Sequence, residues 1–176
     1  GGQVGVYWSA FTSLWLPKSL LDGPTVERFV DAWHAASRHS VVELHFNKGL
    51  AGADKAALEG SRQTPMNPEV LDAFALAIIS GGQPAAYPGW NEPDRNEAEA
   101  ASSRIRAADH ALRSVVPHGG SYMSECDYFL QDWKRACWGR HATRLEAIKQ
   151  RYDPDGLFVV HHGVGSDLWS EDGLSR

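Results

Sequence analysis

The residues best suited to moving protons alternate with apolar residues in the segment 40–49, SVVELHFNKG. Successive side chains of an extended chain point to opposite sides, so this segment would have a polar row and an apolar row. The polar row consists of Glu43, His45 and Asn47, and the apolar row of Val42, Leu44 and Phe46. A His–Glu pair on one side of a strand can relay protons to and from a bound substrate. The alternative, an exposed polar face of a strand, explains the same pattern.

A second polar segment, SYMSEC, covers residues 121–126, and we expect it to form a strand. Alternation would divide its side chains between two faces. One face carries Ser121, Met123 and Glu125, and the other carries Tyr122, Ser124 and Cys126. Glu125 and Tyr122 are candidates for acid–base chemistry. The alternatives are a solvent-facing or salt-bridged Glu125, and a packed Tyr122 with its hydroxyl hydrogen-bonded.

The chain contains two cysteines, Cys126 and Cys137. Cys137 lies at the end of the helix expected for QDWKRACW, which can fold back over the preceding strand and bring the two sulfurs together. We therefore predict a disulfide between them, and with it a secreted protein, because disulfides persist outside the cytosol. The alternative is a pair of buried free thiols, since cysteine also packs as a small apolar residue.

The remaining polar motifs do not predict a metal site or a phosphate site. His161 and His162 are adjacent, and on an extended strand adjacent side chains point apart and cannot chelate one ion. The other histidines have no cysteine or carboxylate at metal-ligand spacing. GVGSDL, residues 163–168, resembles a nucleotide fingerprint, but no strand–turn–helix pattern follows it.

Strands and helices alternate along the chain and would position these groups. Strands are expected at residues 2–11, 40–49 and near 76–79, the last after a short helix or turn in NPEVLDAFALAIIS. A helix should begin at Pro24 with Thr25 as its N-cap. Its apolar stripe would be Val26, Phe29, Val30 and Trp33. The longest helix would have its stripe at Ala101, Ile105, Ala108, Leu112 and Val115.

After Pro117 we expect the SYMSEC strand, the short QDWKRACW helix, and a helix in HATRLEAIKQRY with Leu145 and Ile148 facing inward. Asp153 and Pro154 would end that helix, and GLFVVHHGVGS would run extended. Several short strands within one domain predict an α+β fold, a largely antiparallel sheet with helices covering one face.

Size and composition narrow the possible functions. The chain has 176 residues, seven tryptophans and 43% hydrophobic residues, which suits one folded domain with its own core. A net charge of −5 gives no reason to expect nucleic acid or an anionic membrane as a partner. No apolar run approaches the ~20 residues of a membrane span. The first residues have neither an initiator Met nor a signal peptide, which we interpret as a processed or excised piece.

Two long stretches, GGSYMSECDYFLQDWKRACWGRHATRLEAIKQRYDPDGLF and HHGVGSDLW, resemble the C-terminal end of known flavoproteins. The pattern they match is Y-x-N-x-x-D, W-x-x-x-(aromatic)-W-G and R-L-x-x-I-K-x-x-Y-D-P-x-x-x-F. It is typical of the berberine-bridge-enzyme-like branch of the vanillyl-alcohol oxidase superfamily, close to fungal isoamyl alcohol oxidases. FNKGLAGA and MNPEVLDAFALAI also fit such proteins, so the resemblance spans nearly the whole chain.

The resemblance implies a division of the chain. Residues 1–110 would be part of a substrate-binding (cap) domain. Residues 111–176 would be a berberine-bridge-like C-terminal segment, packed in one unit with the first and returning towards an FAD domain. That FAD domain, which binds the diphosphate and often links the flavin to a His, would be an N-terminal chain or domain of the same precursor.

The resemblance also assigns roles to residues. Relatives place an active-site Tyr or Glu at the position of Glu125, facing the flavin ring, so Glu125 is the first candidate for the base, with His45 and Tyr122 as further catalytic candidates. The candidates for contact with FAD are Ser124, Trp138 and His141. Ser124 replaces the usual Asn, and His141 stands where relatives have another Asn. Cys126 and Cys137 replace what are commonly an Ala and an aromatic residue.

The function implied is the substrate side of an FAD-dependent oxidase. It would oxidise a primary, phenolic or sugar-like alcohol by hydride transfer to flavin, with O2 as the acceptor. The alternative is a cofactor-free accessory or binding subunit derived from such an enzyme. The departures at Ser124 and His141 favour the alternative, while Glu125 and the C-terminal motifs favour the enzyme.

Overall fold

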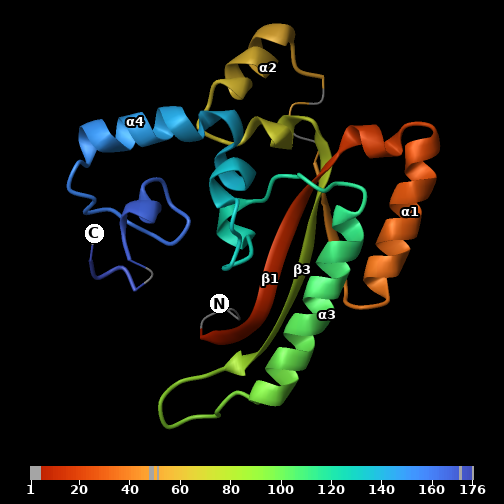
Figure 1. Cartoon of the computed structure of the whole chain (residues 1–176). Helices are drawn as coiled ribbons and strands as arrows, with labels where there is room; N and C mark the ends of the chain where they lie inside the picture. Colours follow the sequence, from red (N-terminus) through yellow and green to blue (C-terminus); the bar gives the residue numbers. More distant parts are fainter. Residues whose placement is uncertain (1–4, 48–49, 51, 171, 176) are drawn as a thin grey trace.

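A computed structural model describes residues 5–47, 50, 52–170 and 172–175. Figure 1 shows the two long strands side by side, with α3 lying along them and α1 beyond it. The elements in chain order are β1 (Val6–Pro17), η1 (Lys18–Leu21), α1 (Pro24–Ser37), β2 (Glu43–Phe46), α2 (Lys55–Arg62), η2 (Pro68–Leu71), β3 (Ala73–Ala85), α3 (Arg95–Arg113), η3 (Met123–Glu125), η4 (Lys134–Trp138), η5 (Gly139–His141), α4 (Ala142–Tyr152) and η6 (Ser166–Leu168). The η elements are 3₁₀ helices, apart from η4, which is a π-helix.

The sheet is antiparallel in the order β1–β3–β2. Ala77 of β3 lies opposite Leu14 of β1 on one side and Leu44 of β2 on the other. The central strand β3 has a continuous apolar run, ALAII, because its side chains are buried on both faces of the sheet. The first strand begins and ends later than the expected residues 2–11, and residues 1–4 lie outside the described part of the chain.

Helices α1 and α3 pack together, and α3 also lies against β1 and β3. The apolar stripe of α3 is buried as its spacing predicts, with Ile105, Ala108 and Leu112 all 3% exposed or less. The core they join is made of Leu14, Leu16, Leu20, Phe29, Ala36, Ala75, Ala77, Ile79 and Val116. The predicted α+β class is confirmed. No helix in the described residues is long and apolar enough to cross a membrane.

Helix α1 differs from its prediction in two respects. Gly23, not Thr25, is the N-cap, and the Thr25 hydroxyl donates instead to the backbone carbonyls of Ser19 and Asp22. The predicted stripe is also misplaced, because Val30 and Trp33 are largely exposed. The residues that α1 buries are Phe29, Ala32 and Ala36. Small alanines allow the helix to approach its neighbours closely, which the larger residues would prevent.

The expected strand at SYMSEC is wrong. Residues 123–125 form the 3₁₀ helix η3, and the amides before them donate to groups other than the backbone of a strand. The amide of Ser121 donates to Ala136 O at 2.9 Å, and the amide of Tyr122 donates to Ser13 Oγ at 3.1 Å. The alternation argument for Glu125 and Cys126 therefore does not apply, and their positions follow from the turn.

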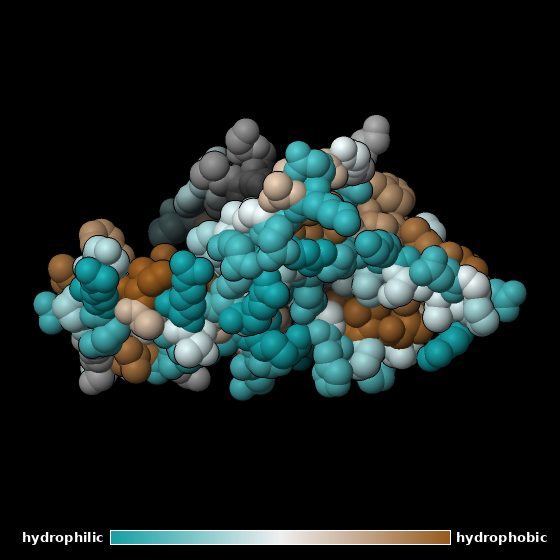
Figure 2. Space-filling model, turned by 90° about the horizontal axis from the view of Figure 1, so that it is seen from above, coloured by the Kyte–Doolittle hydropathy of each residue, from teal (hydrophilic) through white to brown (hydrophobic). Residues whose placement is uncertain are grey.

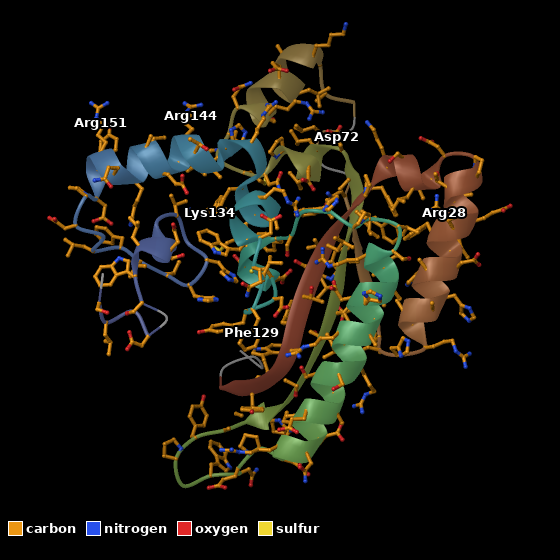
Figure 3. The ribbon with its side chains drawn as sticks, in the orientation of Figure 1. Arg28, Asp72, Phe129, Lys134, Arg144 and Arg151 are labelled. Carbon is orange, nitrogen blue, oxygen red and sulfur yellow. The ribbon has the colours of Figure 1, made fainter. Side chains whose placement is uncertain are left out.

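The C-terminal third folds back on itself. Residues 156–166, expected to be extended, turn at residues 161–165 and enter η6 at Ser166. The inward position predicted for Ile148 is wrong, since Ile148 is 42% exposed. Helix α4 ends at Asp153, as predicted. Lys134, labelled in Figure 3, joins three elements of this region: its Nζ lies 2.6 Å from Glu146 and 2.8 Å from Asp167. The domain division near residue 110 stays a prediction.

Candidate functional site

A cavity of about 530 Å³ lies between the N-terminal half of β1, the middle of α3 and the segment 124–129. Its size is within the range of small-molecule sites. Aromatic rings form part of its wall: Trp8 and Phe11 meet edge to face at 5.1 Å, and Tyr128 and Phe129 at 5.2 Å. Figure 3 shows Phe129 between the segment that carries it and the N-terminal end of β1. The cavity is therefore partly apolar and open to a ring-shaped ligand.

Three carboxylates line this cavity, and two of them have partners in the protein. Asp109 accepts a hydrogen bond from Thr12 Oγ1 at 3.2 Å and pairs with Arg113 at 2.8 Å. Asp127 accepts a hydrogen bond from the amide of Phe129 at 3.1 Å. Asp109 thus links α3 to β1, and Asp127 stabilises the 127–129 turn.

Glu125 is the third carboxylate, and its side chain has no partner of this kind within the described residues. Its amide donates to Tyr122 O at 2.9 Å, which forms the 3₁₀ turn, but its carboxylate makes no hydrogen bond or ion pair within the described residues. Arg106 on α3 also lines the cavity without an ion pair to the described part of the chain. One half-buried carboxylate and one exposed guanidinium are therefore available to a ligand.

The other predicted catalytic residues do not line this cavity. His45 lies on β2, at the opposite edge of the sheet, where its Nε2 is 3.5 Å from Glu43 and its side chain is 59% exposed. The His–Glu pair exists, but it is an exposed strand face, the alternative given above. Tyr122 directly precedes η3; it is 44% exposed, and its ring lies 6.5 Å from that of Trp15.

The predicted flavin-contacting residues are divided between different places. Ser124 lines the cavity beside Glu125. His141 is buried, and its Nε2 donates to Arg62 O at 2.9 Å, so it holds the end of α2 to the beginning of α4. The Nε1 of Trp138 is buried and finds no hydrogen-bond partner in the described residues, so this donor remains free.

The two cysteines are free thiols, so the predicted disulfide is absent from the structure. Their side chains nevertheless influence each other's ionisation. Cys137 lowers the pKa of Cys126, while Cys126 and burial raise the pKa of Cys137. Cys126 Sγ also lies 3.4 Å from His162 Nδ1.

His162 belongs to a column of stacked rings that sequence reasoning missed. The backbone turns at His162 with φ 59°, so the two adjacent imidazoles do not point apart but stack at 3.9 Å. His161 stacks on Tyr128 at 3.9 Å, and His162 on Trp133 at 5.5 Å. The described residues contain no group of three or more His, Cys, Asp or Glu arranged to hold a metal ion.

Comparison with known proteins places this geometry in a family. Residues 121–165, which include Glu125, both cysteines and the ring column, match the family model "Berberine and berberine like". Residues 121–165 are a berberine-like segment. A flavin-dependent oxygenase of Aspergillus ustus is 47% identical over 61% of this chain, and an FAD-linked oxidoreductase of Aspergillus sp. is 36% identical over 51% of it.

Solved structures agree with the berberine-like assignment at the level of the fold. The VAO-type flavoprotein MtVAO713 of Myceliophthora thermophila superimposes with a TM-score of 0.70 over 94% of this chain, at 18% identity. A carbohydrate oxidase of Microdochium nivale superimposes with a TM-score of 0.58 over 92%, at 16% identity. The chain thus shares the fold of part of these proteins. It spans 23% of the A. ustus protein, 17% of the Aspergillus sp. protein and 27% and 32% of the two solved chains.

The described residues fit only a part of the flavin cofactor that such relatives use. After Gly165, the GVGSDL run enters η6, a 3₁₀ helix of three residues, which is too short to present a helix N-terminus to a diphosphate. The cavity beside the berberine-like segment can take a ring, but we find no cradle for the diphosphate in the described part of the chain.

Sequence reasoning found Glu125 and Ser124 but missed most of the cavity wall. Arg106 and Asp109 lie on the edge of the α3 stripe, where helical spacing alone assigns them to solvent. Tyr128 and Phe129 directly follow Asp127 and were not singled out. The run CDYFL could have indicated that Tyr128 or Phe129 lines a surface cavity, since two adjacent aromatic residues in a turn cannot both enter the core.

Proposed function

We propose that this chain is the substrate side of an FAD-dependent oxidase that oxidises an alcohol. The substrate would be a primary, phenolic or sugar-like alcohol, and O2 would reoxidise the cofactor. The observation that supports this most directly is the unpaired Glu125 carboxylate, which lies in an aromatic-lined cavity within the berberine-like segment. The FAD-linked and flavin-dependent names of the relatives support the same class of reaction.

In this proposal Glu125 accepts the proton of the substrate hydroxyl. A general base must reach that proton directly or through one water, and its carboxylate must not be occupied by another partner. Glu125 meets the second condition, whereas Asp109 and Asp127 do not. The rings of Trp8, Phe11 and Phe129 would exclude water and hold the carbon skeleton of the substrate against the wall.

FAD would supply the hydride acceptor, bound mainly by an N-terminal chain or domain of the same precursor. Ser124, beside Glu125, and the free Nε1 donor of Trp138 are the residues of this chain that we propose for contact with it. His141 is a weaker candidate, because its Nε2 is already bonded to Arg62 O.

The test is the substitution Glu125→Gln in the protein assembled with its FAD-binding portion. Loss of a general base should lower the rate of flavin reduction by ~10²-fold or more. Gln keeps the shape of the side chain, so flavin content and the melting temperature should not change. Glu43→Gln makes the same chemical change on the exposed β2 face and should leave the rate unaltered.

Two results would contradict the proposal. Wild-type reduction kinetics in Glu125→Gln would reassign this carboxylate to structure. An assembled protein that binds alcohols but shows no flavin absorbance would favour the second candidate, a cofactor-free accessory or binding subunit. That candidate is supported by the lack of a diphosphate cradle in the described residues and by Ser124 and His141 in place of the usual Asn.

A further inference from the structure

The berberine-like segment contains a second reactive cluster that the proposed oxidation does not use. Cys126 Sγ lies 3.3 Å from Met123 O and 3.4 Å from His162 Nδ1, and the Cys137 thiol lowers the pKa of Cys126. His162 is 6% exposed and is held by stacking on Trp133 and on its neighbouring histidine. Two thiols and an imidazole are thus gathered from three separate parts of the segment.

The two thiols differ in accessibility. Cys126 is half-buried and lines the 530 Å³ cavity, next to Glu125. Cys137 is 4% exposed, lies within η4 and does not line the cavity. A small molecule that enters the cavity therefore meets the sulfur of Cys126 and not that of Cys137.

The two thiols also differ in pKa. The Cys137 thiol stabilises a thiolate on Cys126, which lowers the pKa of Cys126 and raises that of Cys137. Burial and the neighbouring His161 lower the pKa of His162. The thiolate is the nucleophilic form of cysteine. The accessible sulfur, whose pKa is the lowered one, is therefore the better nucleophile of the two.

We propose that Cys126 is a peroxide-reactive thiol and that Cys137 resolves its oxidised form. In the first step the Cys126 sulfur attacks one oxygen of hydrogen peroxide. An S–O bond forms, the O–O bond breaks, and the departing hydroxide takes the original thiol proton and leaves as water. Cys126 is oxidised to a sulfenic acid and the peroxide is reduced.

In the second step the Cys137 sulfur attacks the Cys126 sulfur. An S–S bond forms, the S–O bond breaks, and the hydroxide leaves as water with the Cys137 proton. The sum is two thiols and one hydrogen peroxide giving one disulfide and two waters. The site is a place of reversible modification, because an added dithiol can reduce the disulfide again.

The experiment uses the reduced 176-residue chain, treated with a small excess of hydrogen peroxide. Free thiols are then alkylated under denaturing, non-reducing conditions and the chain is analysed by mass spectrometry. We expect both thiols to become unavailable together, with the intact mass lowered by two hydrogens and restored by dithiothreitol. The same chain unfolded in urea should react more slowly, by about tenfold, because the unfolded Cys126 loses its partners.

Two variants separate the roles of the sulfurs. Cys137→Ser should stop at the sulfenic acid, which a dimedone-type reagent would label on Cys126. Cys126→Ser should leave Cys137 reduced over the same time. His162→Gln should slow the first step several-fold without changing its products.

Three outcomes would overturn the proposal. They are two alkylatable thiols in the peroxide-treated wild type, equal rates in the folded and unfolded chains, and an oxidised Cys137 in Cys126→Ser. The first two outcomes are measured on the wild-type chain. The proposal can therefore be tested even if a variant fails to fold. The reaction mixtures contain neither flavin nor alcohol, so these three outcomes do not depend on whether the proposed oxidase function is correct.

Discussion

At the scale of single residues, the berberine-like segment places two different chemistries side by side. Glu125 and Cys126 are consecutive, and both line the same cavity. The carboxylate has no partner among the described residues, while the sulfur contacts Met123 O and His162.

Asp153, at the end of α4, has a pKa that depends on bonds formed in the folded chain. Its carboxylate accepts hydrogen bonds from the amides of Leu157 and Phe158, at 2.8 and 3.0 Å, and pairs with Lys149. The bond to Lys149 contributes most to lowering the pKa of Asp153 from 3.8 to about 2. Because the folded pKa is the lower one, the stabilisation is complete above the unfolded value of 3.8 and is lost as the pH falls towards 2.

We therefore expect an NMR titration of the Asp153 carboxyl group to have its midpoint near pH 2, as the pKa predicts. Lys149→Met should move the midpoint upwards, since it removes the main partner. Lys55→Met, an exposed lysine of α2, is the matched control and should leave it unchanged. A wild-type midpoint at or above the ordinary value of 3.8 would show that the bonds at the end of α4 are not formed in solution.

At the scale of elements, the sheet and the berberine-like segment are joined by a few buried polar contacts. Ser13 of β1 shares a hydrogen bond of 2.8 Å with Ser121, and both are buried. Asn67, before η2, donates from Nδ2 to Ala136 O at 2.8 Å and accepts from the amide of Glu69 at 3.1 Å. These bonds hold η4, and with it Cys137, against the end of the sheet.

Asn67→Ala should lower the free energy of unfolding by about 1–3 kcal/mol, because it leaves the Glu69 amide without its partner and removes one of the two hydrogen bonds to the Ala136 carbonyl. Asn67 is 3% exposed, so water does not easily replace the lost bonds. Asn96→Ala, on the exposed side of α3, is the control and should change stability by less than about 0.5 kcal/mol. Urea unfolding measures both, and equal midpoints for the two variants would contradict the role given to Asn67.

At the scale of the whole molecule, exposed apolar side chains gather in the chain that follows α4. Leu157 and Phe158, which follow α4, are 79% and 80% exposed, and Tyr152 and Val160 are exposed beside them. Figure 2 shows apolar surface towards the α4 end of the molecule. A surface of this kind usually marks an interface. It is consistent with the proposed FAD-binding portion as a partner.

The chain by itself should then fail to form a stoichiometric complex with FAD. The cavity can hold a ring, but binding a whole dinucleotide also needs a diphosphate site, which the described residues do not offer. Titration of residues 1–176 with FAD, followed by flavin fluorescence, should show no saturable quenching. Adding the FAD-binding portion of the precursor should restore binding, while a yellow one-to-one complex of the chain alone would contradict the prediction.

The sequence by itself determined the features that depend on local periodicity. The stripe of α3, the apolar run of β3 and the end of α4 at Asp153 follow from spacing and from residue preferences within a few positions. The α+β class and the resemblance of residues 119–158 to flavoproteins also follow from the sequence. Glu125 was found in this way, from a motif and not from its surroundings.

Only the tertiary structure decided which groups meet. Ser121 bonds to Ala136, so SYMSEC is a turn and not a strand. Cys126 reaches His162, 36 positions along the chain, and His45 ends at the opposite edge of the sheet from the cavity. The physical reason is that alternation describes which side of its own segment a side chain occupies. It contains no information on which distant segment supplies the hydrogen-bond partners, and these partners decide whether the segment is a strand at all.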